Sequence, residues 1–412
     1  MAIIRPFRGL RPRPELVERV ASLPYDVMDR EEARLMAEGN PYSFLHISRP
    51  EIDLPPDTDP YDDEVYRQGR AALRRAIDEG IYQQDPEPCY YLYRQTMGRF
   101  RQTGLVACAS VDDYQTGVIK KHELTRQDKE DDRVRHIDCL DAHDEPVFYT
   151  YRNDSEISAL FSAVTSQKPV YDFTTDDGVS HTFWVVHDGV LIEHFTELFA
   201  RIPVLYVADG HHRSAAASRV RELRRAANLA HTGDEEYNHF LTVIFPENEM
   251  NIMPYNRVVK DLNGLTVAEF MTRVAQSFDV TPKGAPIEPS RKHSFGMYLS
   301  GRWYELSPRG AFDDTDPVER LDVSILQNLL LSPILGIRNP RTDKRIDFIG
   351  GIRGVAELVR LVDSGEYGVA FSLHPTTMED LMALADADKI MPPKSTWFEP
   401  KLRSGLCLHL LS

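Results

Sequence analysis

Five consecutive residues of this sequence combine the side chains that recognition of an anion needs. Asp209-Gly210-His211-His212-Arg213 directly follows an apolar stretch, residues 204–208, that predicts a buried strand, and residues 213–228, rich in Ala and Arg, predict a helix after it. A strand, a tight turn and a helix in this order aim backbone N–H groups and the positive end of the helix dipole at one place. Gly210 permits close backbone approach or a positive φ at the turn. The segment therefore predicts a phosphate-binding turn.

The basic side chains of this segment are unfavourable for a helix on its own. Positive charge near a helix N-terminus opposes the helix dipole, typically by a few tenths to about 1 kcal/mol per charge. Violations of local rules concentrate at functional sites, and a bound phosphate would resolve this one. The alternative is that Asp209 is only an N-cap and that the two histidines pack inside or face solvent. We favour the functional interpretation because all five residues occur together.

A second group of reactive side chains lies at the end of an earlier predicted strand. His122 and Glu123 end an apolar stretch that begins near residue 117, and ligand-facing residues collect at such strand ends. A carboxylate there can act as a general base or hold a metal ion. The residues that follow, 124–135, mix both signs of charge too densely for a core. For residues 128–132 a solvated, ion-paired helix face and a functional role both stay open.

The C-terminal tail is a third candidate. Its cations and hydroxyls stand beside prolines that stiffen the backbone, which suits phosphate capture, although the glycine pattern of a P-loop is missing. A plain loop that packs Trp397 and Phe398 into the core is an equal alternative. The residues that could contact phosphate are Lys394, Ser395, Thr396, Lys401 and Arg403.

Composition limits the possible classes of function. With 412 residues the chain exceeds the usual size of one hydrophobic core, so two or three domains are expected. Its 48 Lys and Arg against 64 Asp and Glu give a net charge of −16, which argues against binding nucleic acid or an anionic membrane surface. The sequence has no apolar run of eighteen residues and no signal-peptide pattern. Four cysteines without a C-x-x-C pair predict reduced, mostly buried thiols in a cytoplasmic protein.

Motifs of three common enzyme classes are missing. No H-E-x-x-H, G-x-S-x-G or G-x-G-x-x-G occurs, which argues against a zincin, an α/β-hydrolase and a Rossmann dehydrogenase. The alternation of strands and helices predicts an α/β or α+β fold. Asp29 with Glu32 predicts a capping box at a helix start. Other expected elements are helices at 61–79 and 322–331, strands at 44–47 and 405–411, and a hairpin of 183–186 with 190–192 around His187-Asp188-Gly189.

At this point the sequence shows a resemblance to known proteins. The segment Asp209 to Arg213 after a buried strand resembles the D-G-H-H-R motif of free serine kinases built on the ParB/sulfiredoxin-like fold. In those kinases an H-E pair at an earlier strand end carries the catalytic Glu, and His122-Glu123 stands in the corresponding order. The whole chain is also similar to a large bacterial and archaeal family labelled as a domain of unknown function. The matching stretches are 5–12, 24–27, 40–46, 122–133 and 392–401.

The resemblance implies both a fold and an activity. It implies an N-terminal α/β segment (1–105), a ParB-like catalytic core with a mixed sheet (106–260) and a C-terminal α/β domain (261–412) with a phosphate-contacting tail. The interval from Glu123 to Asp209 is longer than in the short serine kinases, with residues 168–188 as the inserted region. The implied reaction transfers a phosphoryl group to free L-serine, or runs in reverse, with Mg²⁺ and with pyrophosphate preferred over ADP or ATP as donor.

The resemblance also assigns roles to the candidate residues. Glu123 would accept the serine hydroxyl proton, and Asp209 would share that role or hold Mg²⁺. The histidines and arginine of the motif, with the helix N-terminus, would stabilise charge on the phosphoryl oxygens. Lys394, Lys401 and Arg403 would hold the other phosphate of the donor. The remaining expected ligand contacts are His122, Arg126, Gly210, Ser395, Thr396, Asp26 and His46.

Two other functions stay open at this stage. A phosphatase acting on phosphoserine would need only a pocket that admits water in place of serine. A ParB-like module that binds nucleotides or nucleic acid is an analogy from the fold alone, and the net charge counts against it. The expected partners are small molecules, and the oligomeric state, monomer or homodimer, stays open.

Overall fold

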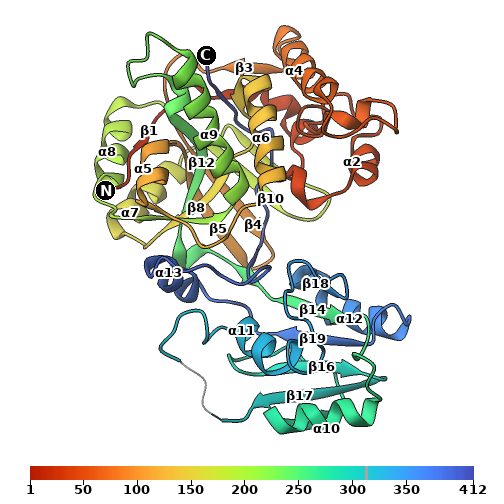
Figure 1. The fold of residues 1–412 in the computed structure, drawn as a ribbon. Helices are drawn as coiled ribbons and strands as arrows, with labels where there is room; N and C mark the ends of the chain where they lie inside the picture. Colours follow the sequence, from red (N-terminus) through yellow and green to blue (C-terminus); the bar gives the residue numbers. More distant parts are fainter. Residues whose placement is uncertain (311–313) are drawn as a thin grey trace. The chain divides into compact units, whose positions relative to one another are not determined.

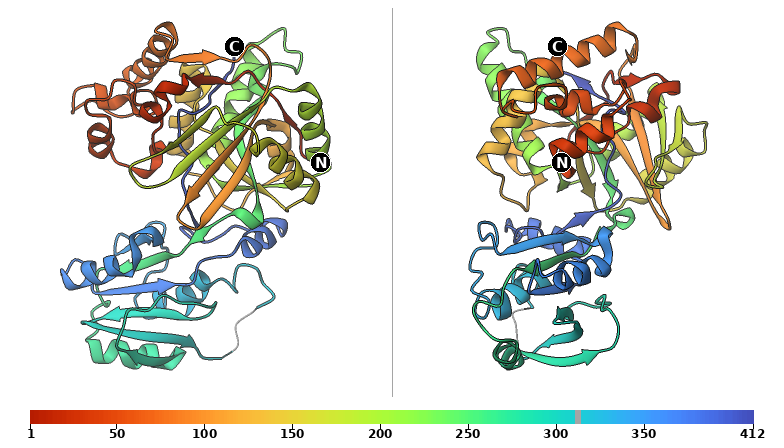
Figure 2. Two further views of the ribbon diagram at one scale, coloured as in Figure 1. Left: turned by 180° about the vertical axis from the view of Figure 1, so that it is seen from behind. Right: turned by 90° about the vertical axis from the view of Figure 1, so that its right-hand side faces the viewer.

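The chain forms two units in the structure, a computed structural model that describes residues 1–310 and 314–412 (Figure 1). Met1–Met250 and Pro400–Ser412 make the first unit, and Asn251–Glu399 makes the second. Residues 1–105 and the expected catalytic core up to Met250 therefore share one unit. The tail, dark blue in Figure 2, returns to the first unit, where Ser404 bridges to Ser22 and Leu408 to Leu10.

The first unit is built on one large sheet of mixed direction. Its strands follow the order β6-β11-β8-β12-β5-β4-β10-β9, and β1 pairs with β5. Strand β11 runs parallel to β6 and antiparallel to β8, while β8 and β12 are parallel. The expected mixed α/β fold is thereby confirmed. The strands are β1 (Ile4–Arg5), β4 (Tyr90–Met97), β5 (Phe100–Ser110), β6 (Ile119–Lys120), β8 (Val147–Tyr151), β9 (Tyr171–Thr174), β10 (Ser180–Val186), β11 (Leu205–Asp209) and β12 (His239–Pro246).

Helices and short strands cover this sheet. Helix α9 packs on α6, and α6 packs on α4, so the three lie side by side in Figure 1. The short strands pair as β2 (Leu10–Pro12) with β3 (Tyr82–Gln84) and β7 (Ala142–His143) with β21 (His409–Leu410). The helices are α1 (Val17–Val20), α2 (Arg30–Ala37), α3 (Leu45–Ser48), α4 (Asp63–Asp78), α5 (Val111–Thr116), α6 (Gln127–Leu140), α7 (Ser155–Thr165), α8 (Gly189–Phe199) and α9 (His211–Ala227).

The core of the first unit explains why β11 ends where it does. Residues 205–208 are all buried, as an apolar run inside a large sheet should be, and Asp209 is the first residue that is not. The register of β11 against β8 shifts between Val207 and Asp209, which marks a bulge at this end. The largest core cluster includes Tyr90, Leu105, Tyr149, Phe195, Phe199 and Val207.

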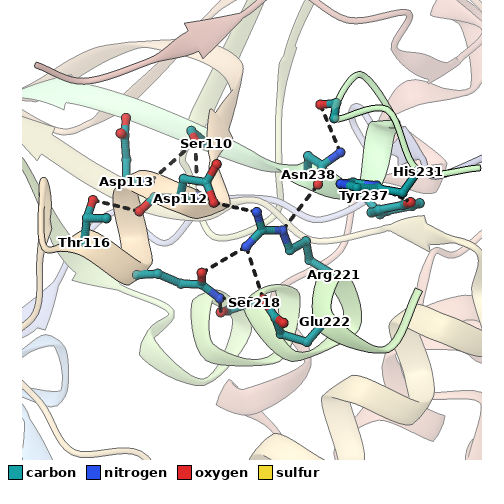
Figure 3. Close-up of polar contacts among 12 residues, drawn as sticks. Ser110, Asp112, Asp113, Thr116, Ser218, Arg221, Glu222, His231, Tyr237 and Asn238 are labelled. Carbon is teal, nitrogen blue, oxygen red and sulfur yellow. Dashed lines mark hydrogen bonds and ion pairs between the residues drawn. The ribbon is translucent and has the colours of Figure 1, made fainter. Parts of the chain in front are cut away.

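A polar network fixes the second half of α9 (Figure 3). Arg221 is buried, and its guanidinium donates to Asp112 at the start of α5, to Gln115 Oε1 (2.9 Å) and to Asn238 Oδ1 (3.3 Å) just before β12. It also reaches Glu222 on its own helix at 3.1 Å. The network therefore ties the second half of α9 to α5 and to the segment before β12.

Two local expectations are wrong, and one is confirmed. Residues 44–47 do not form a strand: Phe44 is the N-cap of α3, and residues 45–47 lie in that helix. So short an apolar run has no period that separates strand from helix. The hairpin around His187-Asp188-Gly189 is absent from the described structure. Asp188 is instead the N-cap of α8, and its Oδ1 accepts from Val190 N at 2.9 Å and Leu191 N at 3.1 Å. The capping box of Asp29 with Glu32 at the start of α2 is confirmed.

The second unit is a smaller antiparallel sheet with helices. Its strand order is β15-β17-β16-β19-β14-β18, and β13 pairs separately with β20. The expected helix at 322–331 is confirmed as α11, which continues as a π-helical turn over Gln327–Leu331. The strands are β13 (Ile252–Met253), β14 (Tyr255–Val259), β15 (Phe278–Lys283), β16 (Phe295–Leu299), β17 (Arg302–Pro308), β18 (Ile346–Gly350), β19 (Val369–Leu373) and β20 (Trp397–Phe398). The helices are α10 (Val267–Ser277), α11 (Asp322–Leu326), α12 (Gly354–Asp363) and α13 (Met378–Asp386).

Two further expectations concern the whole chain. All four cysteines are free thiols, and Cys89, Cys108 and Cys407 are buried, as expected. In the described residues no helix has the length and apolar character that a membrane crossing requires. The expected strand at 405–411 is reduced to β21.

Candidate functional site

The turn between β11 and α9 has the geometry that the sequence indicates. Gly210 has φ +94°, a left-handed conformation that side chains strain. A Cβ at this position would also stand 3.1–3.2 Å from the guanidinium of Arg213, so a larger residue would meet that side chain. The N-cap of α9 is Gly210, which has no side chain to cap the helix, and the first N–H groups of a helix have no partner within the helix. The turn therefore presents backbone donors at the strand end.

Asp209 forms an ion pair with the tail. Its Oδ1 accepts from Gly210 N at 2.8 Å, and its Oδ2 is 2.9 Å from Lys401 Nζ. Burial alone would raise the pKa of Asp209, but the positive charges of Lys401 and Arg213 outweigh it and hold the pKa below its usual range. The carboxylate is therefore ionised at neutral pH. Lys401, one of the expected phosphate contacts, therefore lies beside the first residue of the Asp209–Arg213 motif.

His211 connects the motif to Glu123. The ring is 5% exposed at its side chain, and its Nδ1 is 3.8 Å from Glu123 Oε2. The backbone N–H of His122 faces Nε2 of the same ring at 3.5 Å, and the two histidine rings meet edge to face at 4.4 Å. A neutral imidazole that accepts at Nε2 carries its proton on Nδ1, which faces the carboxylate. Glu123 itself stays accessible, with 41% of its side chain exposed.

The histidines around the turn are neutral. Burial, with the neighbouring His122, lowers the pKa of His211 well below its ordinary value. Burial also lowers the pKa of His122, to about 4, and that of His212, whose Nε2 accepts from Arg126 N at 3.1 Å. The expected pair of cationic imidazoles thus differs from the structure, because desolvation disfavours the charged form. Neutral rings also remove most of the conflict with the helix dipole.

Arg213 is a buried cation that faces inward. It is 8% exposed, and its Nη1 donates to Pro146 O at 2.6 Å. Burial works against its charge, but Asp26, Glu145 and Asp209 keep the pKa of the guanidinium above its normal value. Asp26, an expected ligand contact, is exposed, and its charge acts on both Arg213 and His212. The positive charge of the motif is therefore that of Arg213, which lies buried next to the turn.

Two expected ligand contacts are engaged elsewhere in the first unit. Arg403 is buried, and its guanidinium donates to Thr175 Oγ1 at 3.0 Å and pairs with Asp177. His46 on α3 pairs with Asp53 at 2.9 Å, which raises the pKa of its ring. In the described part of the chain, neither shows a hydrogen bond or ion pair to the residues of the turn. Arg126 contributes its backbone N–H, while its side chain pairs with Asp128.

Three residues of the expected tail site belong to the second unit. Ser395 Oγ donates to Pro392 O at 2.7 Å, and the ammonium of Lys394 lies 5.7 Å from the ring centre of Tyr255. Thr396 follows directly and precedes β20. Their contribution to phosphate binding stays a prediction.

Buried charged residues that the sequence did not single out surround Arg213. Glu145 is 6% exposed, and its Oε1 accepts from Tyr25 N at 3.1 Å and from Ser404 Oγ at 2.9 Å. Burial raises the pKa of Glu145 to about 7. Arg133 is also buried, and its guanidinium lies 4.0 Å from the ring centre of Tyr25. Glu145 thus joins the loop that carries Asp26 to the tail that carries Lys401.

A metal ion would find few ligands among these residues. In the described residues, no three side chains of His, Cys, Asp or Glu are grouped so that they could hold a metal ion. Both oxygens of Asp209 already accept, from Gly210 N and Lys401 Nζ. Mg²⁺ often uses only one or two carboxylates together with substrate phosphates. The donor set therefore does not fit a resident metal, and it allows Asp209 at most as a single ligand to an ion that enters with phosphate.

Comparisons with known proteins give the following result. A free serine kinase in complex with AMP is similar at 14% identity and a TM-score of 0.35, over 74% of this chain and 92% of that chain. A conserved hypothetical protein from Pyrococcus furiosus has 14% identity and a TM-score of 0.33, over 74% and 95%. C-terminally truncated SbnI from Staphylococcus aureus has 10% identity and a TM-score of 0.35, over 74% and 87%. No curated protein matches.

The match to a protein family covers the β11–α9 turn and most of the first unit. The family's sequence profile extends over residues 4–324. The chain belongs to the DUF1015 family of proteins of unknown function.

Proposed function

We propose that this protein is a phosphotransferase that moves a phosphoryl group to the hydroxyl of free L-serine, or runs the reverse reaction, with pyrophosphate preferred over ADP and ATP as donor. The observation that carries the proposal is one cluster at the end of β11. There a carboxylate, Glu123, stands 3.8 Å from His211, and an ion pair, Asp209 with Lys401, stands at the glycine turn. The resemblance of the D-G-H-H-R segment to serine kinases supplies the choice of serine.

Glu123 is the proposed proton acceptor. Asp209 is a poor base, because its lowered pKa and its bond to Lys401 keep it ionised and occupied. Glu123 is half-exposed, so an acceptor hydroxyl can reach it. Nδ1–H of His211 faces that carboxylate at 3.8 Å, which is longer than a hydrogen bond, and we assign His211 the role of a positioning residue that approaches Glu123 when the acceptor binds.

Charge on the transferring phosphoryl group would be stabilised at the turn. The N–H groups in the first turn of α9 and the ammonium of Lys401 are the proposed contacts, and Arg213 adds positive charge from the interior. Phosphoryl transfer depends mainly on positioning and electrostatic stabilisation, which is what this set of groups offers. Mg²⁺ is proposed to arrive with the donor phosphates and to neutralise part of their charge.

The direct test is product analysis. Purified protein is incubated with L-serine and Mg²⁺, with pyrophosphate, ADP or ATP in parallel, and O-phosphoserine is measured by mass spectrometry. The reverse reaction starts from O-phosphoserine and phosphate or the corresponding nucleotide. We expect O-phosphoserine with pyrophosphate, and its loss in Glu123→Gln. Phosphate released from O-phosphoserine in water alone would favour the phosphatase, and silence with every donor in both directions would overturn the proposal.

A further inference from the structure

A small cavity beside Arg213 holds two unsatisfied buried atoms. Its volume is about 10 Å³, and Arg133, His143, Asp144, Glu145 and Arg213 are among the residues that line it. This volume is close to what a single water molecule needs. Oε2 of Glu145 and Nε2 of His143 are buried, and within residues 1–310 and 314–412 neither atom has a hydrogen-bond partner; the two residues are 6% and 5% exposed. Buried polar atoms are nearly always satisfied, so a water molecule that joins the two is the simplest occupant.

A chain of imidazoles leads from this cavity to the surface. His143 and His409 are cross-strand partners in β7 and β21, with their Nδ1 atoms 3.3 Å apart. His409 Nε2 is 2.7 Å from Oε2 of Glu236. The side chain of Glu236 is 45% exposed and, with His409 and Arg5, lines a hollow of about 340 Å³. The contacts therefore continue from the cavity to solvent.

The carboxylate of Glu236 determines which nitrogen of His409 and of His143 donates in the two hydrogen bonds. Burial would raise the pKa of Glu236, but His409 and Arg5 lower it below its usual value, so Glu236 is ionised and only accepts. His409 must then carry its proton on Nε2, and its Nδ1 accepts from Nδ1–H of His143. Burial lowers the pKa of both rings, so both are neutral. Nε2 of His143, the nitrogen that remains for the cavity, is therefore an acceptor in need of a donor.

We propose that Glu145, a water molecule, His143, His409 and Glu236 form a proton path between the buried carboxyl beside Arg213 and the surface hollow. A proton leaves Oε2 of Glu145 through the water to Nε2 of His143. His143 releases its Nδ1 proton to Nδ1 of His409, which releases its Nε2 proton to Glu236 and then to solvent. One proton enters the imidazole pair and one leaves it, so both rings stay neutral and exchange tautomers. A proton that returns by the same route restores the starting state.

The charges that face Glu145 suggest what the path serves. Arg213 on α9 and Arg133 on α6 favour the ionised carboxylate, while Asp144 and Asp26 favour its protonated form. The pKa of about 7 lets either form exist near neutral pH. The negative charge of an anion bound at the β11–α9 turn would offset the positive charge of Arg213 and so raise the pKa of Glu145. Glu145 would then take up a proton and release it when the anion leaves. The path works for any anion and does not depend on serine as the acceptor.

Infrared spectroscopy of the full chain tests the path. We expect a protonated-carboxyl band that titrates near pH 7 and disappears in Glu145→Gln. After transfer to D₂O this band should shift without delay in the wild type. In Glu236→Gln and in His143→Phe the band should remain, but its shift should be slowed at least about tenfold, because exchange then waits for local opening.

The controls separate the path from a general loss of structure. Glu236→Gln changes a half-exposed side chain, so its folding is expected to be intact even if His143→Phe fails to fold. Glu15→Gln, an exposed carboxylate outside the path, should exchange like the wild type. Absence of a band that is lost in Glu145→Gln, or unchanged exchange in Glu236→Gln, would overturn the proposal. Neither result depends on kinase activity, so the proposed function is tested separately.

Discussion

Arg213 and Arg221 on α9 are buried to a similar degree but have different hydrogen-bond partners. Arg221 is 6% exposed, and its guanidinium donates hydrogen bonds to four partners, Asp112, Gln115, Glu222 and Asn238, here called the Arg221 network (Figure 3). Arg213 is 8% exposed, and the described hydrogen bond of its guanidinium goes to Pro146 O, while three carboxylates act on it electrostatically. The same residue type on one helix thus makes many direct bonds at one place and few at the other.

The difference indicates that Arg221 has a structural role and that Arg213 has a role in binding a ligand. A guanidinium that donates four of its five N–H groups to side chains of the protein holds elements together and has little left for a ligand. Arg213 keeps positive charge next to an uncapped helix N-terminus and a glycine turn, where an anion can approach. The Arg221 network is therefore the anchor of α9, and the end of α9 at Asp209–Arg213 is its working part.

The largest effect is expected at Glu123. Glu123→Gln keeps the shape and removes the proton acceptor, so kcat for O-phosphoserine formation should fall by about 10²–10⁴. The stability should change little, because the side chain is 41% exposed. Asp128→Asn is the matched control, since it changes an exposed carboxylate of the following helix that pairs only with Arg126 in the described contacts. Full activity of Glu123→Gln would remove Glu123 from the mechanism.

Arg213→Met should be the most destabilising change on α9. It removes the guanidinium that acts on Glu145 and Asp209, so these carboxylates keep only Arg133 and Lys401 as opposing charges. Breaking a buried ion pair typically costs about 3–5 kcal/mol. Urea unfolding measures this, and calorimetry with pyrophosphate should show weaker binding in the folded fraction. If the variant is as stable as the wild type and binds pyrophosphate equally well, Arg213 does not carry the charge of the turn.

Arg221→Met should be milder and should spare the site. Its partners Asp112 and Glu222 have side chains that are 67% and 55% exposed, so water replaces the lost bonds there. Buried Asn238 loses a donor, and we expect a loss of about 1–3 kcal/mol in urea unfolding. The folded variant should bind pyrophosphate like the wild type. A loss of binding larger than in Arg213→Met would reverse the comparison.

The last expected effect is a dependence of stability on pH that comes from Glu145. Because its pKa is raised to about 7 in the folded protein, the carboxyl stabilises the fold while protonated, fully below its ordinary value of about 4.3. This stabilisation is lost as the pH rises through about 7. The free energy of unfolding of the wild type, relative to that of Glu145→Gln, should therefore decrease from about pH 4.3 to about pH 7 and stay level above about pH 7. Urea midpoints of both proteins across this range provide the measurement, and parallel curves would contradict it.

Local sequence patterns predict some of these features well. The apolar run of β11, the glycine at the turn and the following helix are neighbours in the chain, so their geometry follows from short-range rules. The capping box at α2 is local in the same sense. The short apolar stretch at 44–47 carries too little periodicity, and the Asp-Gly pair at 188–189 fits both a hairpin turn and a helix N-cap.

Other parts of the site depend on contacts between distant segments. Lys401 and Asp209 are 192 residues apart, so the tail lysine could be proposed for the site but not assigned to Asp209. Glu145 and His143 look like surface residues in the sequence and become buried only when β7 pairs with β21. The neutral state of His211 and His212 likewise follows from burial, which residue type alone does not reveal.

The most direct test of the central claim is a crystal structure of the protein soaked with pyrophosphate and Mg²⁺. The account predicts pyrophosphate at the β11–α9 turn, with a phosphate contacting the N–H groups at the start of α9 and the ammonium of Lys401. Pyrophosphate bound only elsewhere, with the ion pair of Asp209 and Lys401 unchanged at the turn, would contradict it.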